Sequence, residues 1–273
     1  MRILRLYAPM LKGEHTLCWV SNGAEGGSCI NGVETVLRLA RAGDAINESG
    51  RCEMTIVLPR QAKLKNGYFL SLDDCGTLLR WNETARYFEV VSAGFFSVSA
   101  KVSVWSPLRT AVLTVSDKCS RGERKDTSGP ALAALAGGLG CEVTDRKIVS
   151  DDITSITDTV SMWSDEGYNL VLITGGTGLS QRDVTPEALL RIAEKTVPGF
   201  GEVMRLQTIK YTERAFLTRS LAVIKGKTLI ISFPGSERAV RQCFDAVSGA
   251  LRHGVETLAG IDGECGEHVG HGR

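Results

Sequence analysis

A run of five residues, Thr-Gly-Gly-Thr-Gly at 174–178, places three glycines between an apolar segment and a helix signal. Glycine has no Cβ and adopts positive φ readily, so the backbone N–H groups of such a loop can converge on phosphate oxygens. In the helix signal, Thr185 is expected to be the N-cap and Pro186 the first helical residue. The positive end of the helix dipole, with Glu187 in its first turn, would face the same anion. The alternative is a glycine turn that serves tight packing only.

A carboxylate stands between the glycines and the helix signal. A phosphate ligand would repel Asp183 unless a divalent cation bridged the acid and the phosphate. An acidic pair, Asp151 and Asp152, precedes another predicted helix, and one of the two is expected to be its N-cap. The spacing does not say which. These residue types together predict a phosphate ligand bound with a divalent cation.

The elements that position these residues alternate between strand and helix. Apolar runs predict strands at 110–116, 142–149, 170–174, 221–224 and 228–233. Helices are predicted between them: a short alanine-rich helix opening at Gly129-Pro130, an amphipathic helix carrying Ile156, Val160 and Trp163, and a long helix capped by Ser236. This order predicts a three-layer α/β domain with a mostly parallel sheet.

Ligands of such a sheet bind at the carboxyl ends of its strands. Four polar segments follow predicted strands: Ser116-Asp117, Ser150-Asp151, 174–178 and Pro234-Gly235-Ser236. Four separate segments of Ser, Asp, Thr and Gly at one edge favour a polar ligand that lies across it. The sequence therefore predicts one shared site.

The order of the motifs resembles the Mog/MoaB family of molybdenum cofactor biosynthesis. The resemblance covers roughly residues 108–260 and rests on Val-Ser-Asp-Lys-Cys-Ser-Arg-Gly-Glu at 115–123, Asp-Thr-Ser-Gly-Pro at 126–130, Ile-Val-Ser-Asp-Asp at 148–152, the glycine run at 174–178, Arg-Asp-Val-Thr-Pro-Glu at 182–187, Pro-Gly-Phe-Gly-Glu-Val-Met-Arg at 198–205, Leu-Thr-Arg at 217–219 and Phe-Pro-Gly-Ser at 233–236. It implies a molybdopterin-binding α/β domain that forms a homotrimer. In Mog-type members it implies adenylylation of molybdopterin by Mg-ATP, with release of pyrophosphate.

The resemblance also implies roles for individual residues. Asp151 and Asp183 would be the catalytic pair and hold Mg²⁺, because the family register favours Asp151 over its neighbour. Arg205 and Arg219 would clamp anions, since a guanidinium matches phosphate geometry, although Arg205 could also lie on a solvated helix face. The other candidates would bind nucleotide or pterin: Thr174, Gly175, Gly176, Thr177, Gly178, Thr185, Pro186 and Glu187 the phosphate or nucleotide, Ser116, Asp117, Ser120, Gly122, Asp126 and Ser128 the pterin side, and Pro234, Gly235 and Ser236 the last edge of the site.

Two functions follow from these assignments. The first is a molybdopterin adenylyltransferase with ATP and molybdopterin as substrates and Mg²⁺ as cofactor. The second is a non-catalytic molybdopterin carrier that docks a molybdenum-insertion protein or a client enzyme through its N-terminal part. The sequence does not distinguish molybdenum from tungsten as the eventual metal.

Residues 1–106 differ in character from the rest. Short alternating runs punctuated by Asn, Asp and Gly predict a small β-rich domain. Over roughly residues 33–93, with Leu-Pro-Arg-Gln at 58–61, this part resembles the N-terminal domain of the urease accessory protein UreE. Gln61 replaces a glycine of that family, and its metal-binding histidine motif has no counterpart, so nickel delivery is not implied. A protein-docking module and an appendage that only stabilises the protein both fit. Ser106-Pro107 marks the joint, which gives domains at 1–106 and 107–260 and a flexible tail at 261–273.

Composition excludes several classes of function. With 32 Lys and Arg against 31 Asp and Glu and no block of like charge, a nucleic-acid partner is not expected. No apolar run has the length of a membrane span and no signal peptide is recognised, so we expect a cytoplasmic protein without a membrane partner. The eight cysteines include no Cys-x-x-Cys pair and indicate free thiols. Cys265, His268 and His271 could bind a soft metal, although a glycine-rich terminus favours a flexible end.

Overall fold

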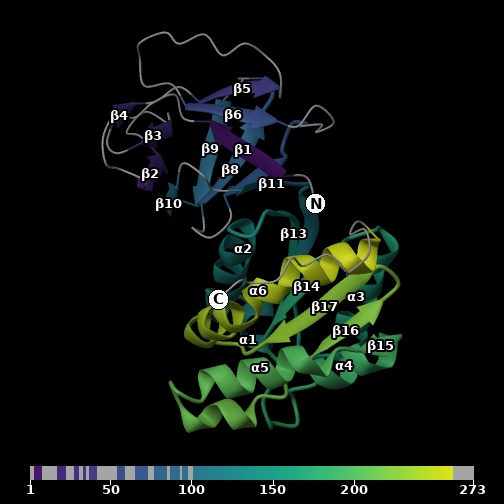
Figure 1. The fold of residues 1–273 in the computed structure, drawn as a ribbon. Helices are drawn as coiled ribbons and strands as arrows, with labels where there is room; N and C mark the ends of the chain where they lie inside the picture. The colour runs from purple at the N-terminus through teal and green to yellow at the C-terminus, as the bar shows by residue number, and fades with distance from the viewer. Residues whose placement is uncertain are drawn as a thin grey trace. The chain divides into compact units, whose positions relative to one another are not determined.

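The protein is described by a computed structural model (Figure 1). It describes residues 101–260 without a gap and, before them, residues 3–7, 17–22, 28–30, 33–34, 37–41, 54–58, 65–72, 77–84, 87–92 and 94–97. The chain divides into two compact units, Met1–Pro107 and Leu108–Arg273. The candidate metal ligands Cys265, His268 and His271 lie outside the described residues.

The first unit is built from strands, as its alternating sequence predicts. They are β1 (Ile3–Tyr7), β2 (Leu17–Asn22), β3 (Ser28–Ile30), β4 (Val33–Glu34), β5 (Leu37–Arg41), β6 (Met54–Leu58), β7 (Phe69–Leu72), β8 (Thr77–Asn82), β9 (Tyr87–Ser92), β10 (Gly94–Ser97) and β11 (Lys101–Trp105). They form one sheet in the order β5-β6-β1-β11-β7-β8-β9 and a second in the order β10-β2-β3-β4. Part of the segment that resembles UreE, residues 59–64, lies outside the described residues.

The second unit contains a six-stranded, mostly parallel sheet. Its order is β13 (Cys141–Val149), β12 (Leu108–Val115), β14 (Leu170–Thr174), β17 (Thr228–Phe233), β16 (Ala222–Lys225) and β15 (Lys195–Thr196). The first four strands run parallel, while β16 and β15 are antiparallel to their neighbours. This confirms the predicted sheet, and β14 begins and ends at the predicted residues.

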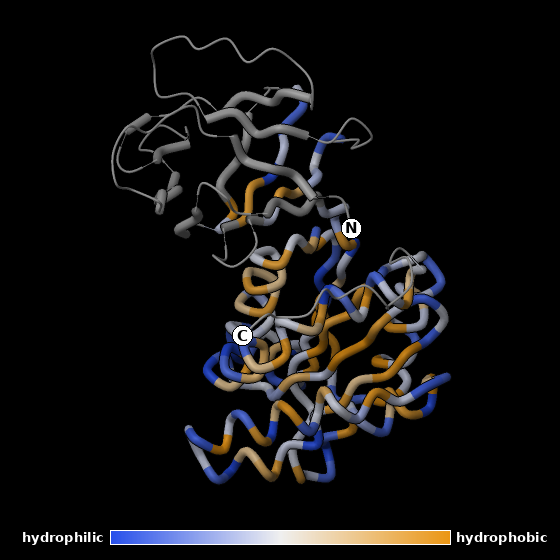
Figure 2. The backbone as a smooth tube through the Cα atoms, viewed as in Figure 1, coloured by the Kyte–Doolittle hydropathy of each residue, from blue (hydrophilic) through white to orange (hydrophobic). Residues whose placement is uncertain are grey.

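Helices cover both faces of this sheet. On one face, α2 (Ser128–Gly137), α5 (Pro198–Thr208) and α6 (Glu237–Ala259) enclose a core with side chains such as Leu172 and Ile231. On the other, α3 (Ile153–Asp165) and α4 (Thr185–Ile192) enclose a core with the alternate residues, such as Val171 and Ile230. Strands buried on both faces are apolar throughout, which Figure 2 shows as orange central strands. The three predicted layers are therefore present.

The connections leave a crevice at one edge of the sheet. The crossover from β12 to β13 carries α2 on one face, and the crossover from β13 to β14 carries α3 on the other. Since β13 and β14 flank β12, the direction of the chain across the sheet reverses there. In α/β sheets, ligands bind at such a reversal, beyond the carboxyl ends of the strands. Two short elements, α1 (Asp117–Ser120) and the 3₁₀-helix η1 (Glu213–Leu217), lie in the connections.

One predicted cap is also confirmed. Ser236 precedes α6, and its hydroxyl accepts a hydrogen bond from the Ala239 N–H at 3.3 Å. Among the described residues, the structure has no helix with the length and apolar character to cross a membrane.

Candidate active site

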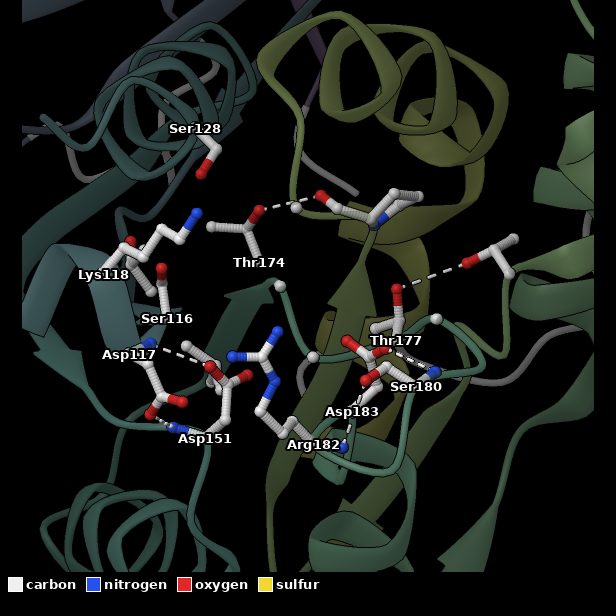
Figure 3. A pocket seen from close by; sticks show the side chains of 18 of the residues that line it. Ser116, Asp117, Lys118, Ser128, Asp151, Thr174, Thr177, Ser180, Arg182 and Asp183 are labelled. Atoms are coloured by element: carbon white, nitrogen blue, oxygen red, sulfur yellow. Dashed lines mark hydrogen bonds between the residues drawn. The ribbon is translucent and has the colours of Figure 1, made fainter. Parts of the chain in front are cut away.

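A cavity of about 520 Å³ opens where β12, β13, β14 and β17 end. Figure 3 shows side chains from the segments that follow these strands pointing into it. Its walls include twelve of the predicted site residues: Ser116, Asp117, Ser128, Asp151, Thr174, Gly175, Gly176, Thr177, Gly178, Asp183, Pro234 and Gly235. The four segments predicted to meet at one edge of the sheet thus contribute to a single cavity.

The loop after β14 requires glycine at two positions. Gly175 has a φ of 101° and Gly176 a φ of 62°. A Cβ on Gly175 would lie 2.2 Å from the Val115 carbonyl oxygen, and a Cβ on Gly176 would lie 2.3 Å from Thr185 Oγ1. Both the backbone conformation and the space therefore exclude a side chain. The prediction of positive φ in this loop is therefore confirmed for Gly175 and Gly176 but not for Gly178, where a Cβ would instead lie 2.9 Å from Asp183 Oδ2.

The carbonyl oxygens of this loop are engaged within the protein. Each carbonyl from 175 to 178 accepts a hydrogen bond from Thr185 or Arg219, at 2.8 to 3.0 Å. By contrast, the N–H groups of residues 176 to 178 donate to no acceptor within the described part of the chain. Consecutive unpaired N–H groups in a glycine loop are the donors that an anion requires.

Asp117 and Asp151 join the ends of β12 and β13. The Asp117 N–H donates to Asp151 Oδ2 at 2.8 Å, and the Asp151 N–H donates to Asp117 Oδ1 at 3.1 Å (Figure 3). The neighbouring Asp152 caps α3, because its Oδ2 accepts from the Ser155 N–H at 2.8 Å. The structure therefore distinguishes the two acids that the sequence left open. Asp152 is the cap, and Asp151 lines the cavity.

The environment of Asp151 is unfavourable for its charge. Burial is the main cause of its raised pKa, and the charges of Asp117 and Asp183 add to the shift. The Asp117 N–H and the cation of Arg182 oppose it. A cation bound among these carboxylates would relieve their repulsion and favour the ionised form of Asp151.

Asp183 lies in a turn that Arg219 braces. Its Oδ2 accepts from the Ser180 N–H at 2.8 Å. The Arg219 guanidinium donates to the Gly178 carbonyl at 2.8 Å and to the Asp183 carbonyl, and it forms a salt bridge with Glu187. One arginine thus ties the glycine loop, the Asp183 turn and the start of α4 together.

The structure corrects the role predicted for the start of α4. The residue before the helix is Val184, so Thr185 is the first helical residue and Pro186 the second. The Thr185 hydroxyl does not accept from the helix but donates to the Gly175 carbonyl at 2.9 Å. Thr185, Pro186 and Glu187 are absent from the cavity walls. In this structure these residues support the loop from behind, and the phosphate contact predicted for the helix start stays a prediction.

The two predicted anion clamps bind main-chain carbonyls in this structure, and their role as clamps stays a prediction. Arg205 donates to the carbonyls of Thr218 at 3.4 Å and Ser220 at 3.3 Å. Arg219 is occupied as described, and neither guanidinium lines the cavity. Both arginines hold main-chain segments in place. The spacing of the motifs in the sequence is compatible with this role and with anion binding alike.

Two residues predicted for the pterin side are exposed. Ser120 donates to the Asp117 carbonyl at 2.9 Å, and Gly122 forms a turn with a φ of 73°. Neither residue lines a cavity described for this unit.

A second, smaller cavity of about 220 Å³ adjoins the first. Arg124, Ser128 and Gly235 line both. Asp126 and Ser236, predicted for the site, line only the smaller one. Asp126 also has a structural task, since it accepts hydrogen bonds from the Thr114 hydroxyl at 2.8 Å and the Gly129 N–H at 3.0 Å.

Four basic side chains that the sequence analysis did not select line the main cavity: Lys118, Arg124, Arg182 and Arg214. In Figure 3, the Arg182 guanidinium lies beside Asp151, while Lys118 points into the cavity from the side of Ser116. Lys118, Arg124 and Arg182 lie within the motif segments at 115–123 and 182–187 or directly beside them. Their position in these segments was the signal that could have identified them as site residues. Arg214 in η1 has no such signal.

Comparisons with known proteins agree with this architecture. Residues 111–253 match the family described as the probable molybdopterin-binding domain. The chain is 36% identical over 156 residues to the molybdopterin adenylyltransferase of Helicobacter pylori strain J99, which covers 56% of this chain and 89% of that protein. It is 42% identical over 149 residues to the molybdenum cofactor synthesis protein cinnamon of Drosophila melanogaster, covering 54% of this chain. It spans only 25% of that longer relative.

Solved structures show the same fold. The crystal structure of the molybdopterin biosynthesis enzyme MoaB from Thermus thermophilus aligns with a TM-score of 0.54 and 40% identity, over 56% of this chain and 97% of that one. The tungsten cofactor synthesizing protein MoaB from Pyrococcus furiosus aligns with a TM-score of 0.52 and 31% identity, over 56% and 98%. These alignments confirm the predicted α/β fold.

Proposed function

This chain belongs to the family of the probable molybdopterin-binding domain, and on that premise we propose that it is a molybdopterin adenylyltransferase of molybdenum cofactor biosynthesis. Its reaction would transfer AMP from Mg-ATP to the terminal phosphate of molybdopterin. An oxygen of that phosphate bonds to the α-phosphorus of ATP. The bond from this phosphorus to the bridging oxygen breaks, and pyrophosphate leaves with the electron pair.

Both reactants are anions, so placement and charge neutralisation supply most of the acceleration. The observation that supports the proposal most strongly is a single cavity that contains both hydrogen-bond donors for phosphate and carboxylates for a cation. The unpaired N–H groups of residues 176–178 offer donors to phosphate oxygens. Asp151 and Asp183 line the same cavity and offer oxygen ligands to a cation. No covalent nucleophile is required from the protein.

The carboxylates fit Mg²⁺ bound together with a nucleotide. Mg²⁺ in nucleotide enzymes is held by one or two carboxylates, and phosphates and water complete its coordination. Among the described residues, no group of three or more His, Cys, Asp or Glu side chains could form an all-protein metal site. When bound, Mg²⁺ would stabilise the charge that develops on the departing pyrophosphate. Arg182, which faces Asp151, is placed to contact the same phosphates.

The test is the reaction itself. Purified protein incubated anaerobically with Mg-ATP and molybdopterin should yield adenylylated molybdopterin and an equal amount of pyrophosphate. Asp183→Asn should lower kcat/KM by roughly 100-fold, because an electrostatic contact to the reacting phosphates is removed. Asp158→Asn, a change to an exposed carboxylate on α3, is the matched control. An Asp183→Asn enzyme with wild-type kinetics would overturn the assignment.

The alternative is a non-catalytic molybdopterin carrier, which the separate first unit favours. The same incubation separates the two functions, since a carrier binds molybdopterin but releases no pyrophosphate. A pulldown with and without residues 1–106 tests the proposed docking role, and equal recovery of partners rules it out. Light scattering after size exclusion tests the proposed homotrimer.

A further inference from the structure

Three hydroxyl groups form a chain that leads from a buried position to the main cavity. Ser220 Oγ lies 2.8 Å from Thr218 Oγ1, and Thr218 Oγ1 lies 3.4 Å from Thr177 Oγ1 in the glycine loop. Ser220 is only 1% exposed, whereas Thr177 and Thr218 line the cavity. In Figure 3 a dashed line joins Thr177 to its neighbour in this hydroxyl chain. The hydroxyl chain therefore has one end in the protein interior and one end at the site.

The main chain that carries these hydroxyls is fixed on both sides. Arg205 of α5 donates to the carbonyls of Thr218 at 3.4 Å and Ser220 at 3.3 Å. At the other end, the Arg219 N–H donates to the Thr177 carbonyl at 2.9 Å. The segment 218–220 and the glycine loop are thus bonded to each other by main chain as well as by side chains.

Only one direction of donation satisfies every group in the hydroxyl chain. A hydroxyl donates once and accepts twice. Within the described residues, Ser220 Oγ has no acceptor other than Thr218 Oγ1, and its burial excludes solvent, so donation to Thr218 avoids an unsatisfied buried hydroxyl. The Ser220 N–H also donates to Thr218 Oγ1, at 3.3 Å. Both lone pairs of Thr218 Oγ1 are then occupied, and its own proton is left to donate to Thr177.

We propose that Ser220 and Thr218 are positioning residues that direct the hydroxyl proton of Thr177 into the cavity, where it donates to a phosphate oxygen of the nucleotide. Thr177 Oγ1 accepts from Thr218, and within the described residues its own proton has no acceptor. The same loop contains the unpaired N–H groups of residues 176–178. This inference rests on the proposed function, which requires a nucleotide phosphate at this loop.

The contact between Thr218 and Thr177 is long for two hydroxyls. Successive hydrogen bonds in a chain polarise and strengthen one another. We therefore expect this contact to shorten when a phosphate oxygen accepts from Thr177. The effect of Thr218 should then be larger on ligand binding than on the stability of the unliganded protein.

Calorimetric titration of the full chain with Mg-ATP, in the absence of molybdopterin, tests this order of donation. Thr177→Val removes the donor and should raise the Kd by roughly tenfold to a hundredfold, since hydrogen bonds to charged groups are strong. Thr218→Val leaves the Thr177 proton without a fixed direction and should raise the Kd by about threefold to tenfold. Thr218→Ser keeps the hydroxyl and should stay within about twofold of the wild type. Because Thr218 acts through Thr177, the double variant Thr177→Val/Thr218→Val should bind no more weakly than Thr177→Val alone.

Thr208→Val is the matched control. Thr208 is another buried threonine, its hydroxyl donates to the Met204 carbonyl at 2.6 Å, and it lines neither cavity. This variant should lose stability in urea denaturation and keep the wild-type Kd for Mg-ATP.

Two results would overturn the inference. One is an unchanged Kd in Thr218→Val, and the other is an equal loss from Thr218→Val in the wild-type and Thr177→Val backgrounds, since Thr218 would then act independently of Thr177. If Thr218→Val does not fold, Ser220→Ala provides the same test. It frees a lone pair of Thr218 to accept from Thr177, so the Kd should rise, and an unchanged Kd would overturn the inference. Binding needs no turnover, so bound Mg-ATP without release of pyrophosphate would overturn the proposed reaction alone.

Discussion

Two loops that follow neighbouring parallel strands form the site by different means. The loop after β12, residues 116–128, offers mainly side chains, including Lys118, Arg124 and three serines or aspartates. The loop after β14 begins with residues 175–178, whose carbonyls are bound by the protein, and the N–H groups of 176–178 are its main-chain donors. The first loop is fixed through its own side chains, since Asp117 Oδ1 accepts from the Asp151 N–H and Ser116 Oγ accepts from the Cys119 N–H and from Arg124. The second is fixed by Thr185 and Arg219 from behind.

The difference shows what each loop can tolerate. A site made of side chains changes affinity when one side chain changes, and the backbone stays in place. A site made of main-chain donors depends on the whole conformation of its loop. Substitution of a residue that never touches the ligand can therefore abolish ligand binding.

The largest effect is expected from Gly175→Ala. Its Cβ would meet the Val115 carbonyl oxygen, and its φ of 101° is strained for alanine. The free energy of unfolding should fall by about 3 kcal/mol, as measured by urea denaturation, with loss of activity. Gly122→Ala in the other loop has a φ of 73° but nothing within 4 Å. It should cost only about 1 to 2 kcal/mol, and equal losses for the two variants would contradict the comparison.

A smaller effect on stability, and a large one on activity, is expected from Arg219→Met. The carbonyls of Gly178 and Asp183 would lose their donor, and the turn that carries Asp183 would be released. We expect the free energy of unfolding to fall by about 1 to 2 kcal/mol. Misplacement of a reacting group can lower kcat by roughly 100-fold. Arg241→Met removes a surface salt bridge with Glu237 and should leave kcat unchanged. A normal kcat in Arg219→Met would show that the loop after β14 keeps its conformation without this arginine.

The smallest effect concerns pH. The pKa of Asp151 is raised, chiefly by burial, so in the metal-free protein its contribution to stability is present at low pH and is lost as pH rises through that raised value. Mg²⁺ competes with the proton, and its affinity should fall as pH drops through the same value. Thermal denaturation at several pH values, with and without Mg²⁺, would measure both trends. Asp151→Asn should flatten them, and an unchanged pH profile in that variant would assign the titration to another group.

Much of the second unit was predictable because its local signals agree. The apolar run at 170–174 is bounded by Asn169 and Gly175, and β14 has those bounds. Ser236 caps α6, whose predicted face of Val240, Phe244 and Leu251 is buried. The two-residue strand β15 was not predicted, because it is too short to leave a periodic pattern. The segment of α5 was recognised only through its motif at 198–205, and no helix was predicted there.

The sequence predicts which segments of the chain line the site, but it does not predict the hydrogen bonds that individual side chains form there. Strand ends placed Asp117, Asp151 and the glycine loop correctly at one cavity. The hydrogen bonds of Arg205 and Arg219 depend on which carbonyls the folded chain brings near them. The spacing of motifs along the sequence does not contain this information. The same holds for Thr185, whose hydroxyl has a backbone acceptor ten residues away.

The mutual bonds between Asp117 and Asp151 limit how the second carboxylate can act. Its Oδ2 is already committed to a backbone N–H, and its Oδ1 is the oxygen nearest Gly176. Asp151 therefore keeps Oδ1 as the oxygen that no hydrogen bond within the described residues engages, and this oxygen would be offered to a cation. A divalent ion that the protein holds through so few oxygens would bind weakly by itself, so we expect it to enter the cavity already chelated by the triphosphate.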